Sequence, residues 1–412
     1  MLLTDTDQAF LHGEAGEATR VAMELLVAIA EAEGAPQLLD ISAAHIDGGL
    51  YHGQAGLDFA RSLVDGGGRV AVPTTLNVSS LDLLHPDLYR GDAGVARAAR
   101  ELMDAYLEMG CAPSWTCAPY QLPDRPAIGE QIAWGESNAI VFANSVLGAR
   151  TARYGDFLDI CCALTGRAPK IGLHTDEGRR ATLRVDLDLP DGLLHDDLMY
   201  PVLGHVLGQV AGTDIPVIVG LDERATEDRL KALGAAAAST GAVGMFHAVG
   251  VTPEATTVED ATGGLPPERT IVVGVGDLVS ARASLSAGAG RLGAVSVGTP
   301  HFSIAELNAL ARLVEGRSTI VPFFVNTSRH DIGEAEKSGS LAIIESFGAT
   351  LVTDTCTYIT PIMGDVRGVV MTNSGKWAFY APANLGVDVV LAGLADCVAS
   401  AVSGDITMSA DW

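Results

Sequence analysis

The sequence predicts an α/β protein with several lobes and mostly parallel sheets. Short β-rich runs alternate with helical runs along the chain, and this alternation is typical of parallel strands joined by helices. Many of the β-rich runs also lead straight into polar or glycine-rich segments. Because ligands bind at the carboxyl ends of strands in open α/β sheets, we expect the chemistry to lie in these segments.

The expected elements follow from apolar periodicity and from the residues that end each run. A helix over 19–33 carries apolar residues on one face and is ended by Gly34 and Pro36. The same reasoning predicts helices over 57–64, 226–238 and 304–314. The expected strands are 69–73, 140–143, 216–220, 270–274, 294–298, 319–325, 349–353, 369–371 and 387–391.

The chain contains no internal repeat and no low-complexity linker that would divide residues 1–412. Strand–helix alternation predicts an inner lobe over about 204–293. The stretch 252–269 is rich in Pro, Gly, Thr and Glu, and is expected to be a surface loop.

The composition bounds the class of protein. With 412 residues, of which 48% are hydrophobic, the chain is long enough to bury the core of two or more lobes. Its net charge of -25 disfavours nucleic acid and anionic membranes as partners. The first ten residues do not resemble a signal peptide, and no apolar run approaches the roughly 20 residues that span a bilayer. We therefore expect a cytoplasmic protein.

Six cysteines are scattered along the chain. None forms a CxxC pair, which excludes a zinc ribbon or a local ferredoxin-type loop. Cys117, Cys356 and Cys397 have polar neighbours, whereas Cys161 and Cys162 lie within an apolar run. The pattern alone slightly favours small core residues for all six, and dispersed metal ligands are the alternative.

A histidine and a carboxylate follow one of the first apolar runs. His45 and Asp47 are two residues apart, so on an extended segment they share a face and can form a general acid/base pair. A hydrogen-bonded turn is equally compatible with this spacing. His174 and His301 also occur near polar loops, but a lone histidine is more often structural.

The densest polar stretch surrounds the strand expected over 140–143. Ser and Asn pairs flank this run on both sides, and Arg150 and Arg153 follow it. The planar guanidinium of Arg suits a carboxylate or a phosphate, so this region is a candidate anion site. Ser374 and Lys376 follow the strand expected over 369–371 in a similar way. Helix capping with surface charges explains both patterns equally well.

Nine short runs, taken together, resemble the aconitase X family almost from end to end. They are AHIDG at 44–48, PTTLN at 73–77, TCAPY at 116–120, ESNAIVFANSVLGART at 136–151, TGRAP at 165–169, GTPHFS at 298–303, DTC at 354–356, MTNSGKWAFYAP at 371–382 and ADCV at 395–398. The resemblance implies an aconitase-like fold and a dehydratase, that is, a hydro-lyase. It also implies that residues 1–412 form one large-subunit catalytic region.

The resemblance also implies a cofactor and a partner. Cys117, Cys356 and Cys397 would hold an iron–sulfur cluster, whose nuclearity the sequence leaves open. Family members combine a large part similar to this chain with a small swivelling domain, either fused or separate. No stretch up to Trp412 is expected to form that domain, so we expect a small swivel-domain subunit and a heteromeric enzyme.

Positions within the family-like motifs suggest roles for individual residues. The catalytic candidates are His45, Asp47 and Lys376, and a base on the partner subunit is a further candidate. The substrate-binding candidates are Thr75, Asn77, Ser137, Asn138, Asn144, Ser145, Arg150, Arg153 and Ser374.

The family contains two known branches, which act on different small hydroxy acids. The leading hypothesis is dehydration of cis-3-hydroxy-L-proline to Δ1-pyrroline-2-carboxylate, because the preference for Arg over Lys indicates a GC-rich bacterium. The alternative is dehydration of mevalonate 5-phosphate or of another small hydroxy acid. A non-catalytic iron–sulfur binding or regulatory protein is the hypothesis from a different class.

Overall fold

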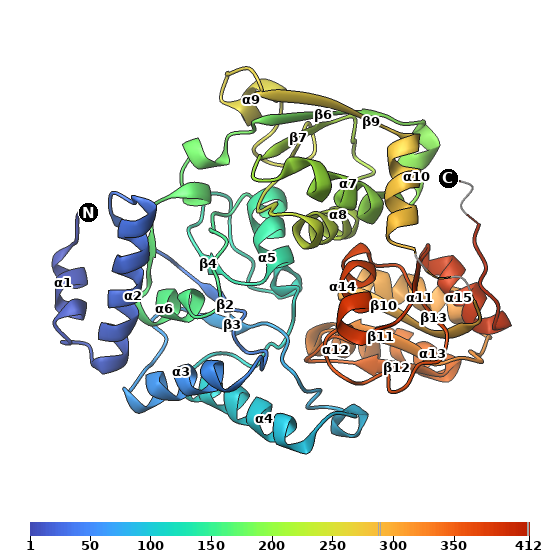
Figure 1. Cartoon of the computed structure of the whole chain (residues 1–412), viewed down its shortest axis with the longest axis horizontal. Helices are drawn as coiled ribbons and strands as arrows, with labels where there is room; N and C mark the ends of the chain where they lie inside the picture. The colour runs from blue at the N-terminus through green and yellow to red at the C-terminus, as the bar shows by residue number, and fades with distance from the viewer. Residues whose placement is uncertain (287, 289, 410–411) are drawn as a thin grey trace. The chain divides into compact units, whose positions relative to one another are not determined.

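The computed structural model describes residues 1–286, 288, 290–409 and 412, and these fall into two compact units. Unit 1 comprises Met1–Leu81 and Asp92–Arg180, and unit 2 comprises Asp82–Gly91 and Ala181–Trp412. Figure 1 labels most of the helices and strands of both units. The predicted α/β fold with mostly parallel sheets is confirmed, because the three larger sheets are parallel and only the β1–β5 pair in the described chain is antiparallel.

Unit 1 packs helices around two small sheets. Its helices are α1 (Asp5–Leu11), α2 (Glu17–Glu33), α3 (Gln54–Asp65), α4 (Ala93–Glu108), α5 (Ser137–Phe142) and α6 (Leu158–Thr165). Its strands are β1 (Leu38–Asp40), β2 (Ala44–Ile46), β3 (Thr74–Leu76), β4 (Ala133–Trp134) and β5 (Arg167–Pro169). Helix α2 forms over nearly the predicted range, and it ends where Gly34 adopts the left-handed conformation at φ +77°.

The three-stranded sheet of unit 1 has the order β3-β2-β4 and is parallel throughout. His45 of β2 pairs with Thr75 on one side and with Trp134 on the other. Since all three strands point the same way, the residues that follow them emerge at one edge. This edge carries Asp47 and Asn77.

The prediction of a strand over 140–143 is wrong, because this segment is helical. Helix α5 runs through it and continues as a π-helix over Ala143–Leu147. The helix is buried on nearly every side, so its apolar run lacks the one-sided periodicity of a surface helix. The Glu136 side chain caps the helix by accepting a hydrogen bond from the Ala139 amide at 2.8 Å.

Unit 2 contains a four-stranded parallel sheet of order β8-β7-β6-β9. The strands are β6 (Leu183–Asp188), β7 (Pro216–Val219), β8 (His247–Ala248) and β9 (Arg269–Gly274). The helices are α7 (Met199–Ala211), α8 (Glu227–Thr240), α9 (Val258–Thr262) and α10 (Val275–Ser284). The lobe predicted over about 204–293 shares most of these elements, although the central strand β6 precedes its expected start. The loop predicted over 252–269 includes the short helix α9.

Helices α7 and α8 pack closely against each other, as Figure 1 shows. A Cβ atom at Gly204 of α7 would lie 2.1 Å from the Leu233 carbonyl oxygen of α8, and one at Gly208 would lie 2.7 Å from the Cβ of Thr240. Glycine is therefore needed at these two positions because the backbones approach one another.

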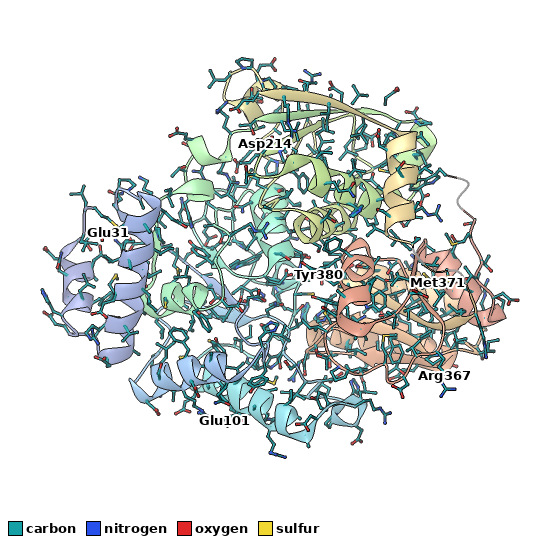
Figure 2. All side chains as sticks on the ribbon, viewed as in Figure 1. Glu31, Glu101, Asp214, Arg367, Met371 and Tyr380 are labelled. Atoms are coloured by element: carbon teal, nitrogen blue, oxygen red, sulfur yellow. The ribbon has the colours of Figure 1, made fainter. Side chains whose placement is uncertain are left out.

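The second sheet of unit 2 has five parallel strands in the order β12-β11-β10-β13-β14. The strands are β10 (Leu292–Phe302), β11 (Phe323–Thr327), β12 (Ala349–Val352), β13 (Val369–Thr372) and β14 (Val389–Leu391). The helices are α11 (Ile304–Val314), α12 (Arg329–Ser338), α13 (Ser340–Phe347), α14 (Gly375–Leu385) and α15 (Leu394–Ser403). Met371, labelled in Figure 2, lies on β13 and is fully buried in the core of this sheet.

The predicted elements of this region agree well with the structure. Helix α11 spans the predicted 304–314, and its first turn is fixed by a capping box between Ser303 and Glu306.

Two strand predictions, one in each unit, are displaced toward the N-terminus. The strand predicted over 69–73 precedes β3, and the strand predicted over 319–325 begins four residues before β11. None of the described helices combines the length and the apolar character that crossing a membrane requires.

Candidate active site

The carboxyl edge of the three-stranded sheet in unit 1 gathers polar side chains. Asp47 follows β2 and Asn77 follows β3, and the Asn77 side-chain amide donates a hydrogen bond to Oδ1 of Asp47. Asp47 is half-buried, whereas Asn77 is buried. These two residues lie at strand ends, where the chemistry is expected, and the pair presents one carboxylate in a fixed orientation.

Asp159 lies directly behind Asp47 and was missed by the sequence reasoning. Its Oδ2 accepts a hydrogen bond from the Asp47 main-chain amide at 2.6 Å, and the side chain is fully buried. Burial raises the pKa of Asp159 to about 7, the charge of Asp47 adds to the rise, and the amides of Asp47 and Ile160 oppose it. The only signal in the sequence was a lone acidic residue within the apolar run 157–164.

His45 is fully buried beneath the same edge. Its Nδ1 lies 2.8 Å from Oγ1 of Thr75, on the neighbouring strand. Burial lowers the pKa of His45 to about 3, and hydrogen bonding with the Thr116 main chain offsets only part of this shift. His45 is therefore neutral near pH 7, where it can orient the Thr75 hydroxyl but carries no positive charge. Thr75 lines a cavity of about 730 Å³ within unit 1.

Cys117 is buried, and its main chain is held by a hydrogen-bonded group in unit 1. The Asn138 side-chain amide donates to the Cys117 carbonyl at 2.6 Å and also to Glu136. Tyr120 donates its hydroxyl to Oδ1 of Asn138 at 2.5 Å, and Ser137 donates to Oε1 of Glu136 at 3.2 Å. Asn138 thus fixes the backbone at Cys117 from the start of α5.

The polar residues after α5 make contacts with the protein itself. Asn144 exchanges hydrogen bonds with the main chain of Thr151 and accepts one from Arg179 at 2.8 Å. Arg150 donates to Asp176 at 2.5 Å, while Ser145 is buried and Arg153 is exposed. The sequence reasoning missed Arg179. Substrate-binding roles for these residues stay predictions.

In unit 2 a histidine and a cysteine lie side by side. The Sγ atom of Cys356 is 3.8 Å from Nε2 of His301, and both side chains are buried. The pKa of His301 is lowered to about 4, chiefly by burial and also by the charges of Lys231 and Lys376, while the hydrogen bond with the Thr355 main chain opposes the shift. The imidazole is neutral near pH 7 and can be a metal ligand or a hydrogen-bond partner for the thiol.

The turn that presents Cys356 is held on both sides. Asp354 has a left-handed backbone at φ +59°, and its carboxylate accepts hydrogen bonds from Arg329 at 2.5 and 2.7 Å. The Thr357 amide donates to Asn326 Oδ1 at 3.0 Å, and the Trp377 indole donates to the Thr357 hydroxyl at 3.0 Å. These contacts make the position of Cys356 rigid.

The remaining predicted residues of unit 2 lie near the starts of two helices. Ser374 caps α14 by accepting a hydrogen bond from the Trp377 amide at 3.0 Å, and Lys376 is buried in the first turn. Cys397 lies on α15 within the hydrophobic core of the five-stranded sheet. Burial raises the pKa of its thiol, and the charge of Asp396 adds to the rise. Metal binding by Cys397 stays a prediction.

Polar strand ends and buried thiols give this α/β protein a candidate active site, and comparison with known proteins identifies its family. Three family models match the chain: Aconitase X first domain over 1–177, second domain over 181–283 and third domain over 292–403. The chain belongs to the aconitase X family, which confirms the resemblance drawn from its motifs.

Several relatives match nearly all of this chain. Cis-3-hydroxy-L-proline dehydratases of Pseudomonas aeruginosa and Hypocrea jecorina are 48% and 44% identical, over 97% and 98% of this chain and 69% of each relative. A phosphomevalonate dehydratase large subunit of Thermococcus kodakarensis is 37% identical, over 92% of this chain and 95% of that relative. The crystal structure of Thermococcus kodakaraensis aconitase X (holo-form) has a TM-score of 0.88 and 35% identity, covering 97% of this chain and all of that one.

The pKa of Asp159 predicts a pH-dependent stability. Between about pH 4 and pH 7 the folded state keeps a proton on Asp159 that the unfolded state has released. The free energy of unfolding should therefore fall as the pH rises through this window, by at most about 4 kcal/mol from this group. Asp159→Asn should remove this component in denaturant unfolding between pH 5 and pH 8. The exposed Asp65→Asn is the control, and parallel pH profiles for wild type and Asp159→Asn would contradict the assignment.

Proposed function

We propose that this chain is the large, cluster-bearing part of a dehydratase that converts cis-3-hydroxy-L-proline to Δ1-pyrroline-2-carboxylate. The observation that carries the proposal is the 48% and 44% identity to two dehydratases named for this substrate, over almost the whole chain. The phosphomevalonate dehydratase large subunits are less similar, at 34–37% identity. A cytoplasmic location is part of the proposal.

A small subunit is the partner that we propose. The chain matches 95–98% of the length of relatives that are named large subunits. A relative named a large subunit implies a small one. We identify the partner as a swivel-domain subunit on the basis of the family resemblance, and it is a further source of a catalytic base.

The cofactor that we propose is an iron–sulfur cluster held by Cys117, Cys356 and Cys397. The thiols are buried, and Cys356 sits in a rigid turn beside a neutral histidine, which suits a metal ligand. Cys397 would have to lose its proton to bind metal. Its apolar surroundings make the thiolate costly unless a metal ion is bound to it. Such a cluster, when bound, supplies Lewis-acid chemistry at the hydroxyl that leaves.

The protein's own groups handle protons and orient the substrate. The half-buried Asp47 carboxylate, fixed by Asn77, is suited to accept or donate a proton at the leaving hydroxyl. Neutral His45 orients the Thr75 hydroxyl toward substrate instead of acting as a charged acid. Loss of the ring proton and the adjacent hydroxyl as water leaves an enamine, which tautomerises to the pyrroline.

Turnover by the reconstituted complex tests the proposed reaction. The chain would be expressed with its small subunit, loaded with iron under anaerobic conditions and incubated with cis-3-hydroxy-L-proline. Formation of pyrroline is the expected result, with trans-4-hydroxy-L-proline as the control substrate. Turnover of mevalonate 5-phosphate instead, or no turnover with a fully loaded cluster, would overturn the assignment.

The cluster assignment predicts that removal of one thiol reduces iron binding. Cys356→Ala should lose most of the bound iron and the visible absorbance, because a cluster with a missing thiolate is readily released. Cys162→Ala is the matched control, since that thiol is equally buried but is not among the proposed ligands. Iron content and absorbance per protein are measured after identical reconstitution. Wild-type iron content in Cys356→Ala would exclude Cys356 as a ligand.

A further inference from the structure

Asp159 is a buried carboxylate to which neither the family motifs nor the proposed reaction gives a role. It lies in the first turn of α6, on a helix that is otherwise lined by apolar and small residues. A carboxylate in such surroundings costs folding free energy, because burial disfavours its charged form. A buried group with this cost is a candidate for a functional role, because it does not serve stability.

The contact that Asp159 makes is with a proposed catalytic residue. Its Oδ2 accepts the hydrogen bond from the Asp47 amide at 2.6 Å, and its Oδ1 accepts one from the Ile160 amide at 2.7 Å. Asp47 is therefore held twice: Asp159 binds its main chain, and Asn77 binds its carboxylate. The two contacts together fix both the position and the direction of the Asp47 side chain.

The surroundings are shaped around this contact. A Cβ atom on Gly135 would lie 2.7 Å from Oδ2 of Asp159, 2.9 Å from the Cβ of Asp47 and 3.0 Å from its amide nitrogen. A Cβ on Gly48 would lie 2.5 Å from the hydroxyl of the buried Tyr106. Gly48 is next to Asp47 in the sequence, and Gly135 is next to it in space. The backbone at both positions can approach these groups only because it is glycine.

We propose that Asp159 is a positioning residue, which acts on the reaction by anchoring the main chain of Asp47 at the carboxyl end of β2. The inference rests on the proposed function, in which the Asp47 carboxylate serves the leaving hydroxyl. Asp159 touches neither substrate nor cofactor in this account. Asp159 holds Asp47 in its working position. This matters because a displacement of a catalytic group by about 1 Å can reduce the rate by about 100-fold.

Asp159→Leu tests the anchor, because leucine has a similar shape and no acceptor for the Asp47 amide. In the reconstituted holoenzyme, kcat should fall by about 10- to 100-fold while KM changes by less than about threefold. Asp159→Asn keeps one acceptor oxygen and should recover most of kcat. The control Asp156→Asn removes a charge from an exposed site in the same segment and should leave kcat unchanged.

Stability separates positioning from simple structural support. The cost of burying the carboxylate and the loss of an acceptor for two amides oppose one another, so the Tm of Asp159→Leu should change little while kcat falls. A fall in Tm of the same variant with proportionate loss of active protein would overturn the proposal. Unchanged kcat in a folded Asp159→Leu enzyme would overturn it as well.

Amide hydrogen exchange tests the anchor without any turnover. Exchange in a peptide covering 44–49 should become faster in Asp159→Leu than in wild type and in Asp159→Asn, because the Asp47 amide loses its acceptor. Equal exchange rates in all three proteins would show that Asp159 does not anchor the Asp47 main chain. If wild type has a loaded cluster but no dehydratase activity, the proposed function fails, while this exchange result still decides whether Asp159 holds Asp47.

Discussion

Parallel strand pairing in the small β3-β2-β4 sheet is the constraint on which the candidate chemistry of unit 1 depends. Pairing of His45 with Thr75 and Trp134 sets the register, and the register decides which residues emerge together at the carboxyl edge. A shift by one residue would turn Asp47 and Asn77 away from each other. The short strands contribute little stability by themselves, so the surrounding buried contacts have to maintain this register.

Both units contain buried polar groups, and burial shifts their pKa values against the charged form unless a partner charge opposes it. His45 is neutral because charging it without water is costly, and Asp159 has a raised pKa for the same reason. In unit 2, Lys231 remains charged because Glu306 and Asp228 outweigh the cost of its burial and raise its pKa. Its ammonium also donates to the His301 carbonyl at 3.3 Å, so this ion pair supports the strand end beside Cys356.

The sequence predicted the fold class and several elements well, because helix caps and apolar periodicity are local signals. Helix α11 is fixed by Ser303 and Glu306, which are visible in the sequence, whereas α5 is buried on nearly all sides and was mistaken for a strand. That polar residues lie at strand ends was predicted from the sequence, but the pairing of Asp47 with Asn77 was not. The role of Asp159 could not be predicted either, because its contact with Asp47 joins positions 112 residues apart. Family motifs, and not spacing, singled out the three cysteines.

The central claim is that the Asp47 carboxylate at the end of β2 serves the dehydration of cis-3-hydroxy-L-proline. The most direct measurement is the kcat of the Asp47→Asn holoenzyme, alongside its iron content. The substitution preserves shape and removes the ionisable group, so kcat should fall by at least about 100-fold with iron content and KM retained. A kcat within about threefold of wild type would contradict the account.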